Sequence, residues 1–87
     1  MEYDVLEARY LHDYTVWVRC RDGSAGEVDL RPVLRGPIFE PLHDLAYFRQ
    51  FTLDPVGCTL AWPNGADIAP EYLHDAVRSD KGSPAGA

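Results

Sequence analysis

Apolar and polar residues alternate near the start of the chain. In "TVWVRC", residues 15–20, the apolar positions Val16, Val18 and Cys20 are separated by Thr, Trp and Arg. A period of two residues is typical of a strand that buries one face. The Asp-Gly pair at 22–23 favours a tight turn, and "AGEVDL" then returns with Val28 and Leu30 on one face. Residues 2–30 are therefore predicted to form a three-stranded antiparallel meander.

The pattern changes in the middle of the chain. In "RPVLRGPIFEPL" the prolines and a glycine interrupt regular structure, so we expect at most one helical turn, ended by Gly36 and Pro37. Asp44 is a suitable N-cap for a short helix over "LAYFRQF". Two further strands, "FTLDP" and "CTLAW", are predicted around a turn in which Pro55 and Gly57 hold the turn positions.

The C-terminal part begins with a turn signal, Asn-Gly at 64–65, which predicts a hairpin. Pro70 suits the first position of a final helix. Its apolar residues Leu73, Ala76 and Val77 share one face that docks onto the sheet, while His74 and Asp75 are expected to point outward.

This order of elements predicts an α+β fold. We expect a small, mainly antiparallel sheet, made of the N-terminal three-stranded meander plus a C-terminal hairpin, with two short helices. Residues 1–78 form a single domain in this interpretation, and residues 79–87, "SDKGSPAGA" from Ser79, form a disordered tail without apolar anchors.

Charge narrows the range of partners. The 87 residues include eight basic and fourteen acidic side chains, which gives a formal net charge of −6. Such a chain repels phosphate backbones, so direct nucleic-acid binding is disfavoured and a basic protein partner is expected. No apolar run suggests a signal peptide or a membrane span, which favours a cytoplasmic location without membrane contact. Exposed strand edges also make a homodimer reasonable.

The sequence gives little evidence for catalysis or metal binding. His12, His43 and His74 each precede an aspartate, but no closely spaced ligand pair supports a metal site, and we expect no metal and no cofactor. Neighbouring His and Asp on a strand or helix point to different faces and form a poor start for a catalytic triad. Cys20 and Cys58 lie in no nucleophile or redox motif. The sequence thus provides no catalytic residue and favours a protein that is not an enzyme.

The tryptophans are better candidates for an interaction site. Trp17 lies on the strand face opposite Val16 and Val18, so either both sheet faces are covered or Trp17 is partly exposed to a partner. We expect the C-terminal helix or the proline-rich segment to cover it. Trp62, next to the Asn-Gly turn, is expected to pack under that turn.

Several segments are similar to a known family. "TLAWPNGADIAPEYL", "VWVRCRDGSAGEVDL" and "GPIFEPLHDLAYFRQFTLD" resemble the bacterial domain-of-unknown-function (DUF) family 2442, over most of the chain to about residue 75. Trp62 to Asp67 is the most specific block, and His74 stands where the family has a tyrosine. The family has no assigned activity, so no catalytic residue is carried over. The resemblance implies an antitoxin-like partner of a small protein encoded nearby.

Two hypotheses follow for the function. The first is an interaction or regulatory domain that captures a basic, toxin-like protein through a sheet edge or the Trp62 to Asp67 hairpin. The second is a small-ligand module without catalysis, whose polar pocket uses Asn64 and Asp67. The candidate site residues are Trp17, Trp62, Asn64 and Asp67.

Overall fold

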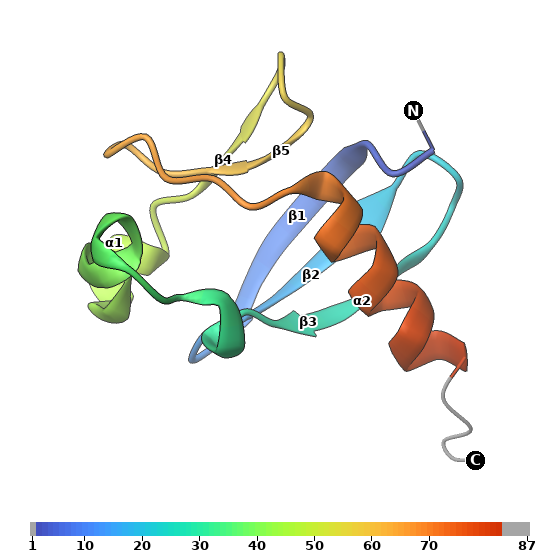
Figure 1. Ribbon diagram of the computed structural model, residues 1–87. Coiled ribbons are helices and arrows are strands. Elements are labelled where there is room, and N and C mark those ends of the chain that lie inside the picture. Colours follow the sequence, from blue (N-terminus) through green and yellow to red (C-terminus); the bar gives the residue numbers. More distant parts are fainter. Residues whose placement is uncertain (1, 83–87) are drawn as a thin grey trace.

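The predicted α+β architecture is confirmed by the computed structural model, which describes residues 2–82. Strands β1, β2 and β3 form an antiparallel sheet in that order, and β4 and β5 form a separate two-stranded hairpin (Figure 1). Along the chain the elements are β1 Val5–His12, β2 Thr15–Cys20, β3 Ala25–Asp29, the 3-10 helices η1 Arg31–Val33 and η2 Pro37–His43, α1 Leu45–Phe48, β4 Thr52–Asp54, β5 Thr59–Ala61 and α2 Pro70–Gly82.

The register of the three-stranded sheet separates an inner face from an outer face. Val16 and Val18 of β2 are fully buried on the inner face, as the alternation predicts. Residues between them point to the opposite side, where Arg9, Trp17 and Glu27 lie in one row across the three strands. Two irregularities in β1, beside Val5 and Tyr10, each add one extra residue to this strand. The residues of β1 on either side of them still share a sheet face with their partners on β2.

Two layers cover the inner face. Helix α2 crosses it, with Leu73 and Val77 fully buried (Figure 1). Val77 lies directly over Gly26 of β3, where a Cβ on the glycine would meet Val77 Cγ1 at 3.6 Å, an ordinary van der Waals separation. The β4–β5 hairpin packs beside β1, where the Val5 amide donates to the Cys58 carbonyl at 2.9 Å. The core lies between these layers and the sheet.

The proline-rich segment is more regular than expected. Instead of being irregular after Gly36, it forms η2, Pro37–His43, with Pro37 in the first turn and Pro41 inside. Pro37 loses no hydrogen bond in the first turn, where the amides have no partner within the helix, and Leu42 anchors the segment by being fully buried. Asp44 caps α1 as predicted, accepting from the Ala46 amide, although α1 already ends at Phe48.

Two other details differ from the sequence expectations. In the β4–β5 turn the residue with positive φ is Cys58, at 54°, and not Gly57. Helix α2 continues past the expected domain end at residue 78 to Gly82. The remainder of the predicted disordered tail, 83–87, lies outside the described residues.

Candidate functional site

The block from Trp62 to Asp67 forms a tight reversal. The Gly65 amide donates to the Trp62 carbonyl at 3.0 Å, and the Trp62 amide donates to the Ala66 carbonyl at 2.9 Å. Only Gly65 has a positive φ, of 92°, so the loop is a three-residue turn with a glycine bulge and not a two-residue Asn-Gly turn. An isolated bridge pairs Ala61 with Asp67 and ends the return.

Trp62 belongs to the core. Its side chain is 4% exposed, and its indole N–H donates to the Phe48 carbonyl at 2.8 Å. Its ring contacts Phe48 and, edge to face, Phe51, with centroids 5.8 and 6.2 Å apart. The expectation that Trp62 packs beneath the turn is confirmed, and its position gives it no surface for a ligand.

Asn64 holds the turn to the rest of the protein. Its side-chain amide donates to the Ile38 carbonyl at 2.9 Å, and its oxygen accepts from the Ala66 amide at 3.0 Å. Both polar ends of the side chain are thus used inside the molecule. Asp67 is exposed and takes part through its backbone bridge to Ala61. The family-typical block is therefore organised as scaffold.

Trp17 has a different environment. Because α2 lies on the inner face of the sheet, neither α2 nor the proline-rich segment covers Trp17, and the expectation that one of them would is wrong. Trp17 is half-buried, and the Arg9 guanidinium lies 5.4 Å from the ring centroid, within the range of a cation–π contact. Its indole N–H has no hydrogen-bond partner among the described residues. Trp17 therefore presents both an aromatic face and a donor to solvent.

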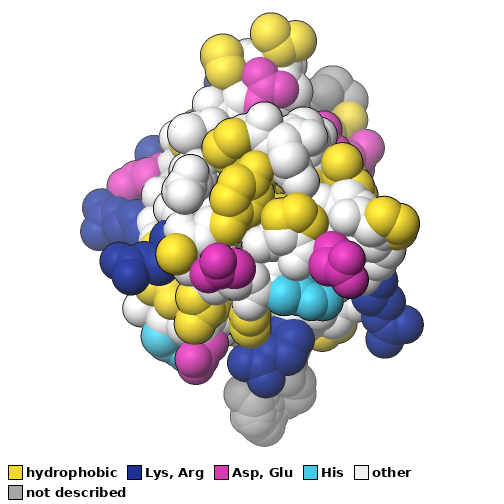
Figure 2. Space-filling view, turned by 90° about the vertical axis from the view of Figure 1, so that its left-hand side faces the viewer, with side chains coloured by type: hydrophobic (Ala, Val, Ile, Leu, Met, Phe, Trp, Pro, Cys, Tyr) yellow, Lys and Arg dark blue, Asp and Glu magenta, His cyan; other side chains and the backbone are white. Residues whose placement is uncertain are grey.

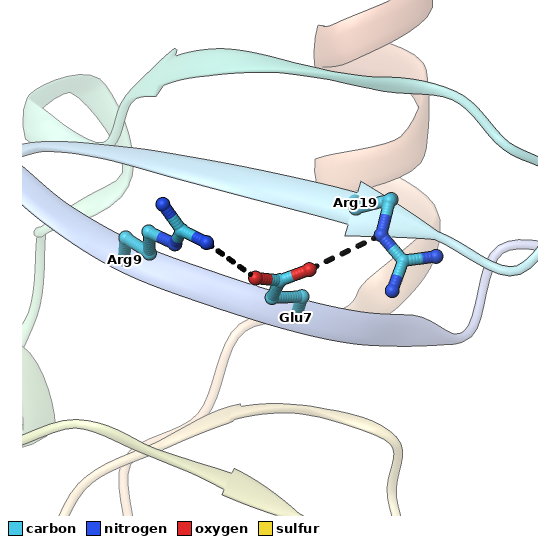
Figure 3. A network of polar contacts seen from close by, with 3 residues as sticks. All are labelled: Glu7, Arg9 and Arg19. Atoms are coloured by element: carbon cyan, nitrogen blue, oxygen red, sulfur yellow. Dashed lines mark hydrogen bonds and ion pairs between the residues drawn. The ribbon is translucent and has the colours of Figure 1, made fainter.

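A charged network occupies the outer face on the β1 side. Glu7 accepts from Arg9 at 2.9 Å and from Arg19 at 3.2 Å, bridging β1 and β2 (Figure 3). The hydrogen bond from Arg9, followed by that from Arg19, holds the pKa of Glu7 below its usual range. Figure 3 shows these side chains in front of the sheet and α2 behind it. The network therefore lies on the side away from the core.

The β3 side of the outer face is acidic and hollowed. An open hollow of about 600 Å³ is lined by His12, Thr15, Trp17, Gly26, Glu27 and Asp29. Glu27 has no ion pair or hydrogen bond among the described residues, and Asp29 accepts only from the backbone amide of Arg31, at 2.9 Å. An aromatic wall beside unpaired carboxylates is suited to a cationic group.

The sequence reasoning singled out Trp17 but not Arg9, Glu27 or Asp29. A signal for all three was available in the alternation itself. Glu27 and Asp29 flank Val28 along β3 and so lie on the other sheet face, and Arg9 lies on that face because it pairs with Trp17. What the alternation could not show is which face the helix would cover.

The histidines are separated and have local partners. His12 Nδ1 lies 3.2 Å from Asp13 Oδ2, and Asp13 sits in the β1–β2 turn with a φ of 45°, outside the regular strand for which no such contact is expected. His43 Nε2 lies 2.7 Å from the Leu34 carbonyl. Within the described residues, no group of His, Cys, Asp or Glu is placed to hold a metal ion.

His74 does not point outward. Its Nε2 lies 2.7 Å from Asp22 Oδ2, and the two side chains are only 13% and 20% exposed. This contact joins α2 to the β2–β3 turn and holds the pKa of Asp22 well below its usual range, with help from the Ser24 amide. Burial, together with the Asp22 charge, raises the pKa of the nearby Cys20 thiol, which disfavours the reactive thiolate.

The end of the molecule formed by η2 and α1 exposes single apolar side chains. Ile38 and Leu45 are the exposed large hydrophobic residues of these two helices. Figure 2 shows hydrophobic side chains scattered among acidic, basic and histidine side chains on this face. Scattered apolar exposure of this kind is ordinary for a small protein.

Comparisons place the chain in a family. Searches of curated proteins and of solved structures found no match. No helix in the described part has the length and apolar character needed to cross a bilayer. The profile of the family described as "Protein of unknown function (DUF2442)" matches residues 5–79, which include the whole of the three-stranded sheet and the Trp62 to Asp67 block. The chain belongs to the DUF2442 family.

Proposed function

We propose that this chain is a non-catalytic interaction domain of the bacterial cytoplasm that binds a small basic protein, as an antitoxin binds its toxin. The observation that carries the proposal is the uncovered outer face of the β1–β3 sheet. There Trp17 lies beside the carboxylates of Glu27 and Asp29, which form no ion pair with any other described residue. Aromatic side chains, tryptophan among them, are enriched at protein interfaces and contribute strongly to binding there.

The charge of the chain supports the same kind of partner. A formal net charge of −6 attracts a basic protein and speeds encounter. The ligand-module alternative loses support, because both polar ends of Asn64 bond within the protein. The interaction hypothesis therefore shifts from the Trp62 to Asp67 hairpin to the face that contains Trp17.

Co-expression with the product of the neighbouring gene tests the proposal. We expect the two proteins to purify together, and growth inhibition by the partner alone to be relieved when the chain is present. Trp17→Ala and Glu27→Lys should weaken both effects. Asp75→Lys is the matched control, because it makes the same charge change as Glu27→Lys at an exposed position on α2.

Two outcomes would contradict the proposal. In one, the chain elutes alone under low salt while the neighbouring product is folded and present in excess. In the other, Trp17→Ala and Glu27→Lys bind as well as the Asp75→Lys control, which would move the interface away from the outer face.

A further inference from the structure

Strand β3 is an open edge of the sheet. The Cys20 amide donates to the Ser24 carbonyl at 2.7 Å, and the Leu30 amide donates to the Tyr14 carbonyl at 2.9 Å. Hydrogen-bonded and non-hydrogen-bonded pairs alternate along an antiparallel ladder. Between these two bonded pairs, Gly26 and Val28 therefore direct their backbone groups toward β2. The N–H and C=O groups of Ala25, Glu27 and Asp29 must point the other way, to the edge.

Nothing in the described part of the chain pairs with that edge. No backbone bond joins Ala25, Glu27 or Asp29 to any described segment beyond β3. In Figure 1, β3 forms the border of the sheet, and α2 lies over its inner face. The other border strand, β1, is joined to the β4–β5 hairpin through Val5 and Cys58. At the β3 border, the backbone groups of Ala25, Glu27 and Asp29 therefore have no pairing partner among residues 2–82.

The acidic side chains of β3 determine what kind of strand can pair with this edge. A second copy of the chain pairing all five residues of β3 antiparallel would place Glu27 opposite Glu27, with like charges in contact. Two exposed acidic residues therefore disfavour self-pairing, which is a common protection of edge strands. The same carboxylates favour a strand that carries positive side chains at alternate positions. The homodimer expected from exposed strand edges is thus disfavoured at this edge.

We propose that β3 receives an extended, basic segment of the partner as a fourth, antiparallel strand. This inference rests on the proposed function and identifies the docking site. Lysine or arginine residues of the segment lie opposite Glu27 and Asp29 on the outer face, in hydrogen-bonded pairs. Intervening apolar residues lie on the inner face, beside Val28 at the margin of the core. Backbone bonds provide the attachment, and the alternating charges provide the specificity.

A capped peptide of alternating lysine and valine is a direct probe, measured by NMR titration of the isotopically labelled chain. The largest amide shifts are expected at Ala25, Glu27 and Asp29. In the proposed pairing, lysine amides of the peptide face β3 and valine amides face away. N-methylation of the lysine amides should weaken binding roughly tenfold or more, whereas N-methylation of the valine amides should leave it unchanged.

Several results would overturn the inference. Equal binding by both N-methylated peptides would mean that charge alone attracts the probe. Shifts centred on α2 or on the β4–β5 hairpin would place the site elsewhere, and no binding at millimolar peptide would exclude the edge. Concentration-dependent shifts of the β3 amides in the chain alone would assign the edge to a second copy.

Two variants separate this inference from the proposed function. Glu27→Pro removes an amide that points to the edge and no bond to β2, while Glu27→Gln removes the charge and keeps the amide. Both variants should bind the co-expressed partner more weakly than the wild-type chain does, and the proline variant should show the larger loss of affinity. If the partner binds the wild-type chain and Glu27→Pro equally, the docking site is wrong and the proposed function stands. If no partner binds the wild-type chain, the proposed function itself fails.

Discussion

The two tryptophans of the chain lie in opposite environments. Trp62 is 4% exposed, packs against Phe48 and Phe51, and donates its indole proton to a backbone carbonyl. Trp17 lies half-buried on the outer face of the sheet, with an arginine over its ring and an indole N–H that no described residue accepts. The two residues therefore separate a region that holds the fold together from one that the fold leaves available.

This difference explains why the most recognisable stretch of the sequence need not be the binding site. The block from Trp62 to Asp67 requires a glycine at a positive φ, an asparagine with two internal bonds and a buried indole. Each requirement is structural. On the outer face of the sheet, Glu27 has no side-chain bond to the other described residues and Asp29 has one, from the Arg31 amide, so this face is less constrained by the fold than the block is.

The largest effect expected from this contrast is on stability. Trp62→Ala should lower the free energy of unfolding by about 3–5 kcal/mol, because it opens a cavity and leaves the Phe48 carbonyl without its donor. Trp17→Ala should cost less than about 1 kcal/mol, since its ring is partly in solvent. Denaturant unfolding of both variants measures the difference. Equal losses of unfolding free energy in Trp62→Ala and Trp17→Ala would contradict the distinction between the two regions.

Gly65 should give the next largest effect. Its φ of 92° is unfavourable for a residue with a Cβ, although the space around it is open. Gly65→Ala should therefore cost about 1–2 kcal/mol through backbone strain alone. Gly65→Asn should cost less, because asparagine tolerates left-handed backbone better than alanine. Identical losses for the two variants in thermal or denaturant unfolding would argue against strain as the cause.

Asn64 tests the link between the turn and η2. Asn64→Ala removes the bonds to the Ile38 carbonyl and the Ala66 amide and should cost about 1 kcal/mol. Asn64→Asp keeps an acceptor for the Ala66 amide but cannot donate to Ile38. It should fall between alanine and wild type in denaturant unfolding. An Asp variant as stable as wild type would show that the contact with η2 contributes nothing.

The contact between Asp22 and His74 should give the smallest effect, visible mainly in acid. The pKa of Asp22 is lowered in the folded protein from its ordinary value of 3.8, chiefly by the hydrogen bond with His74. The unfolded chain therefore binds a proton more readily. The resulting stabilisation is complete above the unfolded pKa and is lost as the pH falls through the folded pKa.

Asp22→Asn should remove this part of the pH dependence. The wild-type protein should lose more stability than the variant as the pH is lowered below about 4. Asp75→Asn is the control, because it removes one exposed charge on α2 that has no bonded partner among the described residues. Unfolding curves with the same acid slope for wild type and Asp22→Asn would contradict the assigned role of the contact.

The sequence predicted the local elements well. Alternation predicted β2, the Asp-Gly turn predicted the return as β3, Asp44 predicted the start of α1, and Pro70 predicted the start of α2. These features depend on neighbours along the chain, so a single sequence contains the information. The helix η2 was missed because prolines were interpreted as interruptions, whereas a short 3-10 helix accommodates them.

Features set by distant contacts were not predictable in the same way. His74 was expected in solvent, but the β2–β3 turn brings Asp22 to it. The sequence predicts that Trp17 is covered, yet α2 packs over the opposite sheet face, where Leu73 and Val77 are fully buried. The position of one helix thus decides which sheet face remains open. Period-two alternation defines two faces but does not specify which one the helix covers.

The central claim is that β3 leaves an unpaired edge beside Trp17. Amide hydrogen exchange of the free chain tests it most directly, because it reads each backbone proton separately. We predict slow exchange at Gly26 and Val28, which bond to β2, and fast exchange at Ala25, Glu27 and Asp29, which face the edge. Slow exchange at all five residues of β3 would show that the edge is already covered and would contradict the claim.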